Sequence, residues 1–101
     1  MSAVMHERIL QALYRAVEQV NQALPPHWRL ASAPGTVLSS GLDSLGIVNF
    51  IVAAEEELAA EFGITINLAD QRAMTQGSSP FRTLQTLADY AATLIGARVD
   101  G

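Results

Sequence analysis

The residues best suited to carry chemistry lie in the run from Ser40 to Gly46, which reads Ser-Gly-Leu-Asp-Ser-Leu-Gly. Here the hydroxyl of Ser44 stands where a loop of small residues passes into a segment with helical apolar spacing. Asp43 precedes it and Leu45 follows it, and Asp and Ser are both favoured residues at a helix start. A serine at such a position is exposed and within reach of another protein. We therefore expect Ser44 to be modified rather than to act as a catalyst.

A hydrolytic role for Ser44 would need a neighbouring base and a third group that orients this base. The glycines at 41 and 46 do not form the Gly-x-Ser-x-Gly turn of serine hydrolases, and no strand precedes the serine. His6 falls in the first predicted helix and His27 in a Pro-Pro-His-Trp loop, so both are interpreted as surface histidines. We expect no enzyme activity, and the alternative is a small serine esterase.

Composition excludes several other classes of protein. The 101 residues suit one domain, 1–101, with a folded core of about 5–96; half of them are apolar and 16% are charged. The formal charge of −4, from 10 acidic and 6 basic residues, argues against a nucleic-acid partner. The chain has no cysteine and only two histidines, so no metal site is expected. No apolar run is long enough to span a membrane and no export signal is visible, so a cytoplasmic monomer is expected.

Apolar spacing predicts the elements that position Ser44. A first helix is expected from about Met5 to Leu24, because apolar residues recur there three and four positions apart and Pro25-Pro26 stops it. A long loop follows as far as Leu42. Its apolar residues are expected to anchor it in the core: Trp28, Leu30 and Leu38.

The second helix should begin at Asp43 or Ser44 and end at Gly63. Its predicted core side is Leu45, Val48, Ile51, Val52, Leu58 and Phe62. A short helix is expected within 68–74, and a last one from about Pro80 or Thr83 to Ile95, with a frayed tail after Gly96. The residues of the last helix that should face the core are Leu84, Leu87, Ala88, Ala91, Leu94 and Ile95. The expected fold is all-α: a four-helix bundle of three longer helices and one short helix, with the long loop between helices one and two.

With these elements in place, the chain resembles the acyl and peptidyl carrier protein family. The resemblance covers the second to fourth predicted helices well and the first only in pattern. It is carried by Gly41-Leu42-Asp43-Ser44-Leu45, Val48, Glu55-Glu56-Glu57, Phe62-Gly63-Ile64-Thr65-Ile66 and Thr83-Leu84-Gln85-Thr86-Leu87-Ala88-Asp89-Tyr90.

The resemblance implies a function for the Asp-Ser-Leu motif. In that family its serine, here Ser44, receives 4′-phosphopantetheine from coenzyme A, and Asp43 and Leu45 flank the attachment point. The thiol of the arm then carries acyl groups as thioesters. The implied partners are a phosphopantetheinyl transferase and the enzymes that load and transfer acyl groups. The alternatives are an aminoacyl or peptidyl carrier and an unmodified helical interaction module.

The second helix is also the expected partner surface. An acidic face of Glu55, Glu56, Glu57 and Glu61 could dock on basic partners, with Glu56 and Glu57 pointing outward most plainly. Many family members are acidic directly after the motif, where this chain has Gly46, Ile47 and Asn49. This more neutral start suggests a carrier specialised for one lipid, fatty-acid or secondary-metabolite pathway. The residues expected to bind partners are Gly46, Ile47, Asn49, Glu56 and Glu57.

Overall fold

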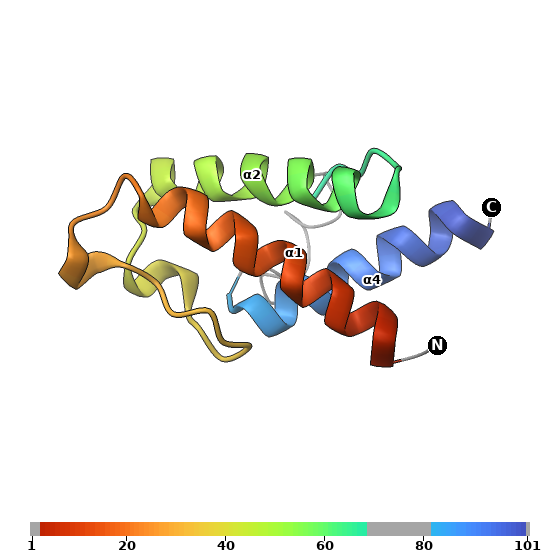
Figure 1. The fold of residues 1–101 in the computed structure, drawn as a ribbon, viewed down its shortest axis with the longest axis horizontal. Helices are drawn as coiled ribbons and strands as arrows, with labels where there is room; N and C mark the ends of the chain where they lie inside the picture. Colours follow the sequence, from red (N-terminus) through yellow and green to blue (C-terminus); the bar gives the residue numbers. More distant parts are fainter. Residues whose placement is uncertain (1–2, 69–81, 101) are drawn as a thin grey trace.

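The computed structural model describes residues 3–68 and 82–100, without the side chains of residues 3, 4, 44 and 97–100. Within these ranges the regular structure is helical apart from one isolated antiparallel bridge between Val37 and Thr83 (Figure 1). The all-α prediction is confirmed for this part of the chain. The short helix predicted within 68–74 lies almost wholly outside the described residues. The elements are α1 (Ala3–Asn21), the 3-10 turns η1 (Pro26–Trp28) and η2 (Leu38–Ser40), α2 (Ser44–Phe62) and α4 (Leu84–Asp100).

Helices α1 and α2 run antiparallel, and α4 crosses α1 (Figure 1). The core lies between them and consists of aliphatic side chains and alanine, with Phe50 as a fully buried aromatic residue. In α1 the fully buried residues recur three and four positions apart, as one face of a helix requires. They are Ile9, Ala12, Leu13, Ala16 and Val17. No helix among the described residues is both long and apolar enough to cross a bilayer.

The predicted core side of α2 is wrong in its first half. Leu45, Val48 and Val52 are 68%, 54% and 48% exposed. The residues that this helix buries are Phe50, Ile51, Ala53, Ala54 and Leu58. The physical reason is that apolar residues occupy every side of the first half of α2, so the spacing alone does not select a face. Contact with α1 and the rest of the core selects it.

The two ends of α2 agree with the sequence prediction. The side chain of Asp43 caps the first turn, and Gly63 follows the last one in the left-handed conformation, with φ 70°. A left-handed residue directly after a helix favours glycine, which has no Cβ to clash. The helix therefore begins at Ser44 for local reasons that are encoded in its neighbours.

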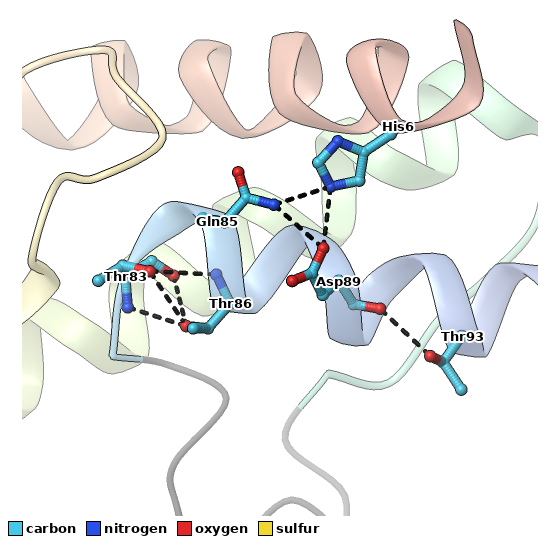
Figure 2. A network of polar contacts seen from close by, with 6 residues as sticks. All are labelled: His6, Thr83, Gln85, Thr86, Asp89 and Thr93. Carbon is cyan, nitrogen blue, oxygen red and sulfur yellow. Dashed lines mark hydrogen bonds and ion pairs between the residues drawn. The ribbon is translucent and has the colours of Figure 1, made fainter. Parts of the chain in front are cut away.

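Helix α4 begins with a reciprocal cap. The Thr83 hydroxyl accepts a hydrogen bond from the Thr86 amide at 3.1 Å, and the Thr86 hydroxyl accepts one from the Thr83 amide at 3.0 Å (Figure 2). This arrangement corresponds to a capping box. The helix then continues to Asp100, so the predicted end at Ile95 is wrong. Its predicted core face is confirmed for Leu84, Leu87, Ala88, Ala91 and Ile95, whereas Leu94 is only half-buried.

The loop between α1 and α2 is tied at two places. The Asn21 side chain exchanges hydrogen bonds with the backbone of Leu30, at 2.9 and 3.0 Å. Further along, three backbone amide hydrogen bonds join the loop to the start of α4: Leu38 N to Arg82 O, Leu84 N to Thr36 O, and Gln85 N to Pro34 O.

Two of the three predicted anchors of this loop are confirmed. Leu30 and Leu38 are buried, but Trp28 is 50% exposed, so its prediction is wrong. Trp28 lies in η1, a turn with no buried residue. The loop is therefore held by backbone bonds and by two leucines, and its indole stays at the surface.

Candidate functional site

Ser44 is the first residue of α2, at the end of the helix that meets the long loop (Figure 1). The structure describes its backbone but not its side chain. Its neighbours in sequence, Asp43 and Leu45, are both exposed. The position therefore lies at a corner of the molecule, between the loop and the first turn of α2.

Asp43 sets the start of this helix. Its Oδ1 accepts a hydrogen bond from the Gly46 amide at 2.8 Å, and its carbonyl accepts the first helical bond from the Ile47 amide at 2.9 Å. The first amides of a helix lack helical partners, so a carboxylate there satisfies one of them and interacts favourably with the helix dipole. The same end of a helix also favours a phosphate group. Asp43 would hold the helix start in this way whether or not Ser44 is modified.

The loop directly before Asp43 is packed closely against η1. A Cβ atom built on Gly41 would lie 2.6 Å from the Trp28 carbonyl oxygen and 2.8 Å from Leu30 Cδ2. Leu42 is buried, and its amide donates a hydrogen bond to the Leu38 carbonyl at 3.2 Å. Gly41 and Leu42 thus position Asp43 and Ser44 against the body of the protein.

Beside this corner is an open depression of about 360 Å³, which we call the Trp28 depression. Its walls come from the turn after α1, from η1, from η2 with the loop that follows it, and from the start of α2. The residues that line it are Leu24, Trp28, Ser39, Ser40, Gly41, Leu42, Asp43 and Gly46. A second depression of about 260 Å³ between α1 and α2 shares Leu24, Leu42 and Gly46 with it.

The exposed side of α2 is apolar near Ser44 and polar further along. We call the following residues the outer face of α2: Leu45, Val48, Asn49, Val52 and Glu56, all of them exposed. They are spaced three and four positions apart, so they follow one side of the helix. An exposed apolar stripe that starts beside a candidate modification site is a candidate surface for protein contact. The sequence interpretation had assigned its three aliphatic residues to the core.

Two of the glutamates that were expected to dock on partners instead form ion pairs and hydrogen bonds with α1. Glu57 Oε1 pairs with Arg15 Nε at 2.8 Å, and its Oε2 accepts a hydrogen bond from the Gln19 amide at 2.5 Å. Glu61 pairs with Arg8 at 2.8 Å and with Arg15 at 3.1 Å. Both glutamates are half-buried, so the prediction that Glu57 points outward is wrong.

These ion pairs also change the titration of the groups. The hydrogen bond from Arg8, with a further contribution from Arg15, lowers the pKa of Glu61 below its ordinary value, against a smaller opposing effect of burial. The hydrogen bond with Glu57 raises the pKa of Arg15. Glu57 and Glu61 therefore fasten α2 to α1.

Among the other predicted partner residues, Asn49 and Glu56 are exposed, whereas Gly46 and Ile47 are half-buried. Glu55 Oε2 accepts a hydrogen bond from the Leu68 amide at 2.7 Å. Of the four glutamates of α2, Glu56 alone makes no ion pair or side-chain hydrogen bond with the described residues. The surface beside Ser44 is consequently more apolar and less acidic than the sequence suggested.

Neither histidine is hydrogen-bonded to a group at the start of α2 among the described residues. His6 lies half-buried on α1, with its Nε2 3.0 Å from Asp89 Oδ1 and 3.2 Å from the Gln85 amide nitrogen of α4 (Figure 2). Arg8, two residues on, pairs with Glu61, which lies 17 residues after Ser44 on α2, or about 25 Å along the helix axis. His27 is exposed and tilted against Trp28, with ring centroids 5.5 Å apart.

No cluster of three potential metal-ligating side chains is found among residues 3–68 and 82–100. No protein-family model, no curated protein and no solved structure matches the chain.

Proposed function

We propose that this chain is an acyl carrier protein that carries acyl intermediates as thioesters on a 4′-phosphopantetheine arm attached to Ser44. The observation that carries the proposal is the position of Ser44: it is the first residue of a capped helix, between two exposed neighbours, with an exposed apolar stripe beginning beside it. A transferase has to bring this hydroxyl to the diphosphate of coenzyme A, which requires a protruding corner of this kind.

The attachment step is a phosphoryl-type transfer to the serine. The Ser44 oxygen forms a bond to the phosphorus that bears the pantetheine group, the bond from this phosphorus to the adenosine bisphosphate breaks, and a base of the transferase takes the serine proton. The amides of the first turn of α2 favour a negative group at this end of the helix. The arm supplies a terminal thiol on which acyl groups are held as thioesters.

The outer face of α2 is the proposed docking surface for the transferase and for the acyl-loading and acyl-transferring enzymes. Its apolar first half can bury surface against a partner, which stabilises a complex by roughly 25 cal/mol per Å² of apolar area. Glu56 adds the charge that can steer a basic partner. We place the carrier in a specialised lipid, fatty-acid or secondary-metabolite pathway, because this start of α2 is neutral rather than acidic.

The esterase alternative has little support from the geometry. His6 is paired with residues of α4, and it lies near the end of α2 that is far from Ser44. His27 makes no hydrogen bond to a carboxylate among the described residues. A serine without an oriented base is a weak nucleophile. An aminoacyl or peptidyl carrier would use the same Ser44, and it differs from an acyl carrier in the enzymes that load it.

The proposal predicts a single covalent modification. After incubation with coenzyme A and a broad-specificity phosphopantetheinyl transferase, intact-mass spectrometry should show an increase of one phosphopantetheine group per chain. Ser44→Ala should abolish this increase, because it removes the hydroxyl to which the arm is proposed to be attached. Ser32→Ala, which removes an exposed hydroxyl elsewhere in the loop, should load fully.

The variants have to be compared as folded proteins, with circular dichroism as the check. Persistent loading of Ser44→Ala would overturn the site assignment. A folded wild-type chain that stays unloaded would instead identify an unmodified helical interaction module. Hydrolysis of activated esters that requires Ser44 but no coenzyme A would favour the esterase.

A further inference from the structure

We infer that the Trp28 depression is a binding site for the phosphopantetheine arm, which we call the seat. The arm would lie there against the indole whenever it is not engaged with a partner enzyme. The inference rests on the proposed function, because it needs an arm at Ser44. It adds a binding site on the loop side of α2 and assigns a role to an exposed tryptophan.

The position of the depression is the first argument. Two of its lining residues, Asp43 and Gly46, lie directly before and two residues after the proposed attachment point. A group tethered to Ser44 therefore starts at the rim of this depression. Its volume of about 360 Å³ falls within the range of roughly 300–1,000 Å³ of small-molecule sites.

The chemistry of the walls is the second argument. The arm is amphiphilic: a dimethyl-substituted carbon and methylene groups alternate with a hydroxyl and two amides. The residues that line the depression have the same mixed character, because the apolar Leu24, Leu42 and Trp28 lie there together with Ser39 and Ser40. An aromatic face offers a large contact area and loses little conformational entropy on binding.

The fold supplies the third argument, because the depression exists only when distant segments meet. Leu24 lies in the turn after α1 and Trp28 in η1, whereas Gly46 belongs to α2. A Cβ on Gly46 would lie 3.2 Å from Asp43 Oδ1 and from Leu42 Cδ2, two walls of the depression. The side of the depression next to Ser44 is thus kept open by a residue without a side chain.

The second depression extends the seat toward the cargo. It continues from the shared residues Leu24, Leu42 and Gly46 along the groove between α1 and α2, past Val20 and Ala53. An acyl group at the end of a seated arm would meet this mainly aliphatic groove. Longer acyl groups should therefore hold the arm in the seat more strongly.

The test uses Trp28 as its own reporter, because the chain contains one tryptophan. Apo and fully loaded protein are compared by acrylamide quenching of the indole fluorescence. Trp28 is 50% exposed, so a seated arm should shield it and lower the quenching constant by roughly half. Nuclear Overhauser contacts should appear between the indole and the methyl groups of the arm.

Two variants make the result specific. The first is the double variant Trp28→Phe/Glu7→Trp, which replaces the indole at position 28 and introduces a new one at position 7. The reporter then lies at an exposed position near the start of α1, at the other end of the molecule (Figure 1). Its quenching should not change on loading. Trp28→Ala should still load at Ser44, and the arm methyl resonances should then take the chemical shifts of the free arm.

The outcomes separate the two proposals. Full loading with unchanged Trp28 quenching and no indole contacts would overturn the seat while leaving the carrier function intact. An equal change at the moved reporter would also overturn it, because the effect would then be global. A chain that cannot be loaded overturns the carrier function and the seat together.

Discussion

At the scale of single residues, Gly41 shows how closely the loop before Ser44 is built. A side chain at this position would enter the space of the Trp28 carbonyl and of the Leu30 side chain. The first of these neighbours is backbone and cannot rotate away. Any residue larger than glycine at position 41 must therefore displace η1 or the loop that leads into α2.

We predict that Gly41→Ala lowers the free energy of unfolding by about 1–3 kcal/mol, the usual cost of forcing atoms into a packed site. Gly35→Ala is the matched control, because a Cβ at Gly35 has no other heavy atom within 4 Å. It should change stability by no more than about 0.5 kcal/mol. Urea unfolding followed by circular dichroism measures both, and equal stability of the two variants would contradict the close approach seen at Gly41.

Residue-scale features that depend on sequence neighbours were predictable. The cap at Asp43 and the helix end at Gly63 follow from local hydrogen bonding and from backbone freedom. The exposure of Trp28 was not predictable in this way. It depends on how η1 sits on the rest of the loop, and a large aromatic residue in a loop is by itself equally compatible with an anchor.

At the scale of elements, α1 and α2 are joined by both apolar and charged contacts. Arg8 and Arg15 of α1 reach across to Glu57 and Glu61 of α2, and Arg8 also lies 4.6 Å from the centre of the Phe62 ring. These pairs join residues 42 to 53 positions apart in sequence. The four charged groups therefore form one network rather than isolated pairs.

The network predicts an acid-sensitive contribution to stability. The pKa of Glu61 is lower in the folded protein than in the unfolded chain, so its contribution is complete above the ordinary glutamate pKa and is lost as pH falls through the lowered one. Glu61→Gln should be less stable than wild type near neutral pH, and the difference should shrink below about pH 4. Urea unfolding at several pH values measures this. Glu56→Gln is the control, because this exposed carboxylate has no ion pair with the described residues, and it should not show such a pH-dependent loss of stability. A constant deficit of Glu61→Gln at all pH values would contradict the assignment.

Element-scale prediction succeeded where the apolar pattern was one-sided. The core face of α4 and the existence of α1 followed from spacing alone. In the first half of α2 the pattern was ambiguous, and Val48 and Val52 were placed on the wrong side. The prediction that Glu57 and Glu61 dock on partners was wrong for a related reason. The sequence shows these charges, but it does not show that arginines of α1 pair with them.

At the scale of the whole molecule, α4 is attached to α1 by the polar cluster of His6, Gln85 and Asp89 (Figure 2). One nitrogen, His6 Nε2, faces both the Asp89 carboxylate and the Gln85 amide. It can donate to the carboxylate or accept from the amide, but it cannot do both at once. The cluster therefore adds an interhelical contact whose form depends on where the imidazole carries its proton.

A double-mutant cycle tests the strength of this contact. The His6 and Asp89 side chains are 33% and 62% exposed, so solvent screens the pair. We expect His6→Ala and Asp89→Ala to show a coupling energy of at most about 1 kcal/mol. Thermal unfolding of the two single variants and the double variant provides the cycle. A coupling of several kcal/mol would mean that the pair is far less solvated than the structure indicates.

The three backbone hydrogen bonds between the long loop and the start of α4 limit how early during synthesis the loop before Ser44 can take its final structure. Residues 34–38 of the loop that leads into Ser44 are hydrogen-bonded through the backbone to residues 82–85. A ribosome must therefore have released the chain at least as far as residue 85 before these three bonds can form. A transferase that recognises the finished corner would then label only chains that extend to residue 85 or beyond, and products that end earlier would escape labelling.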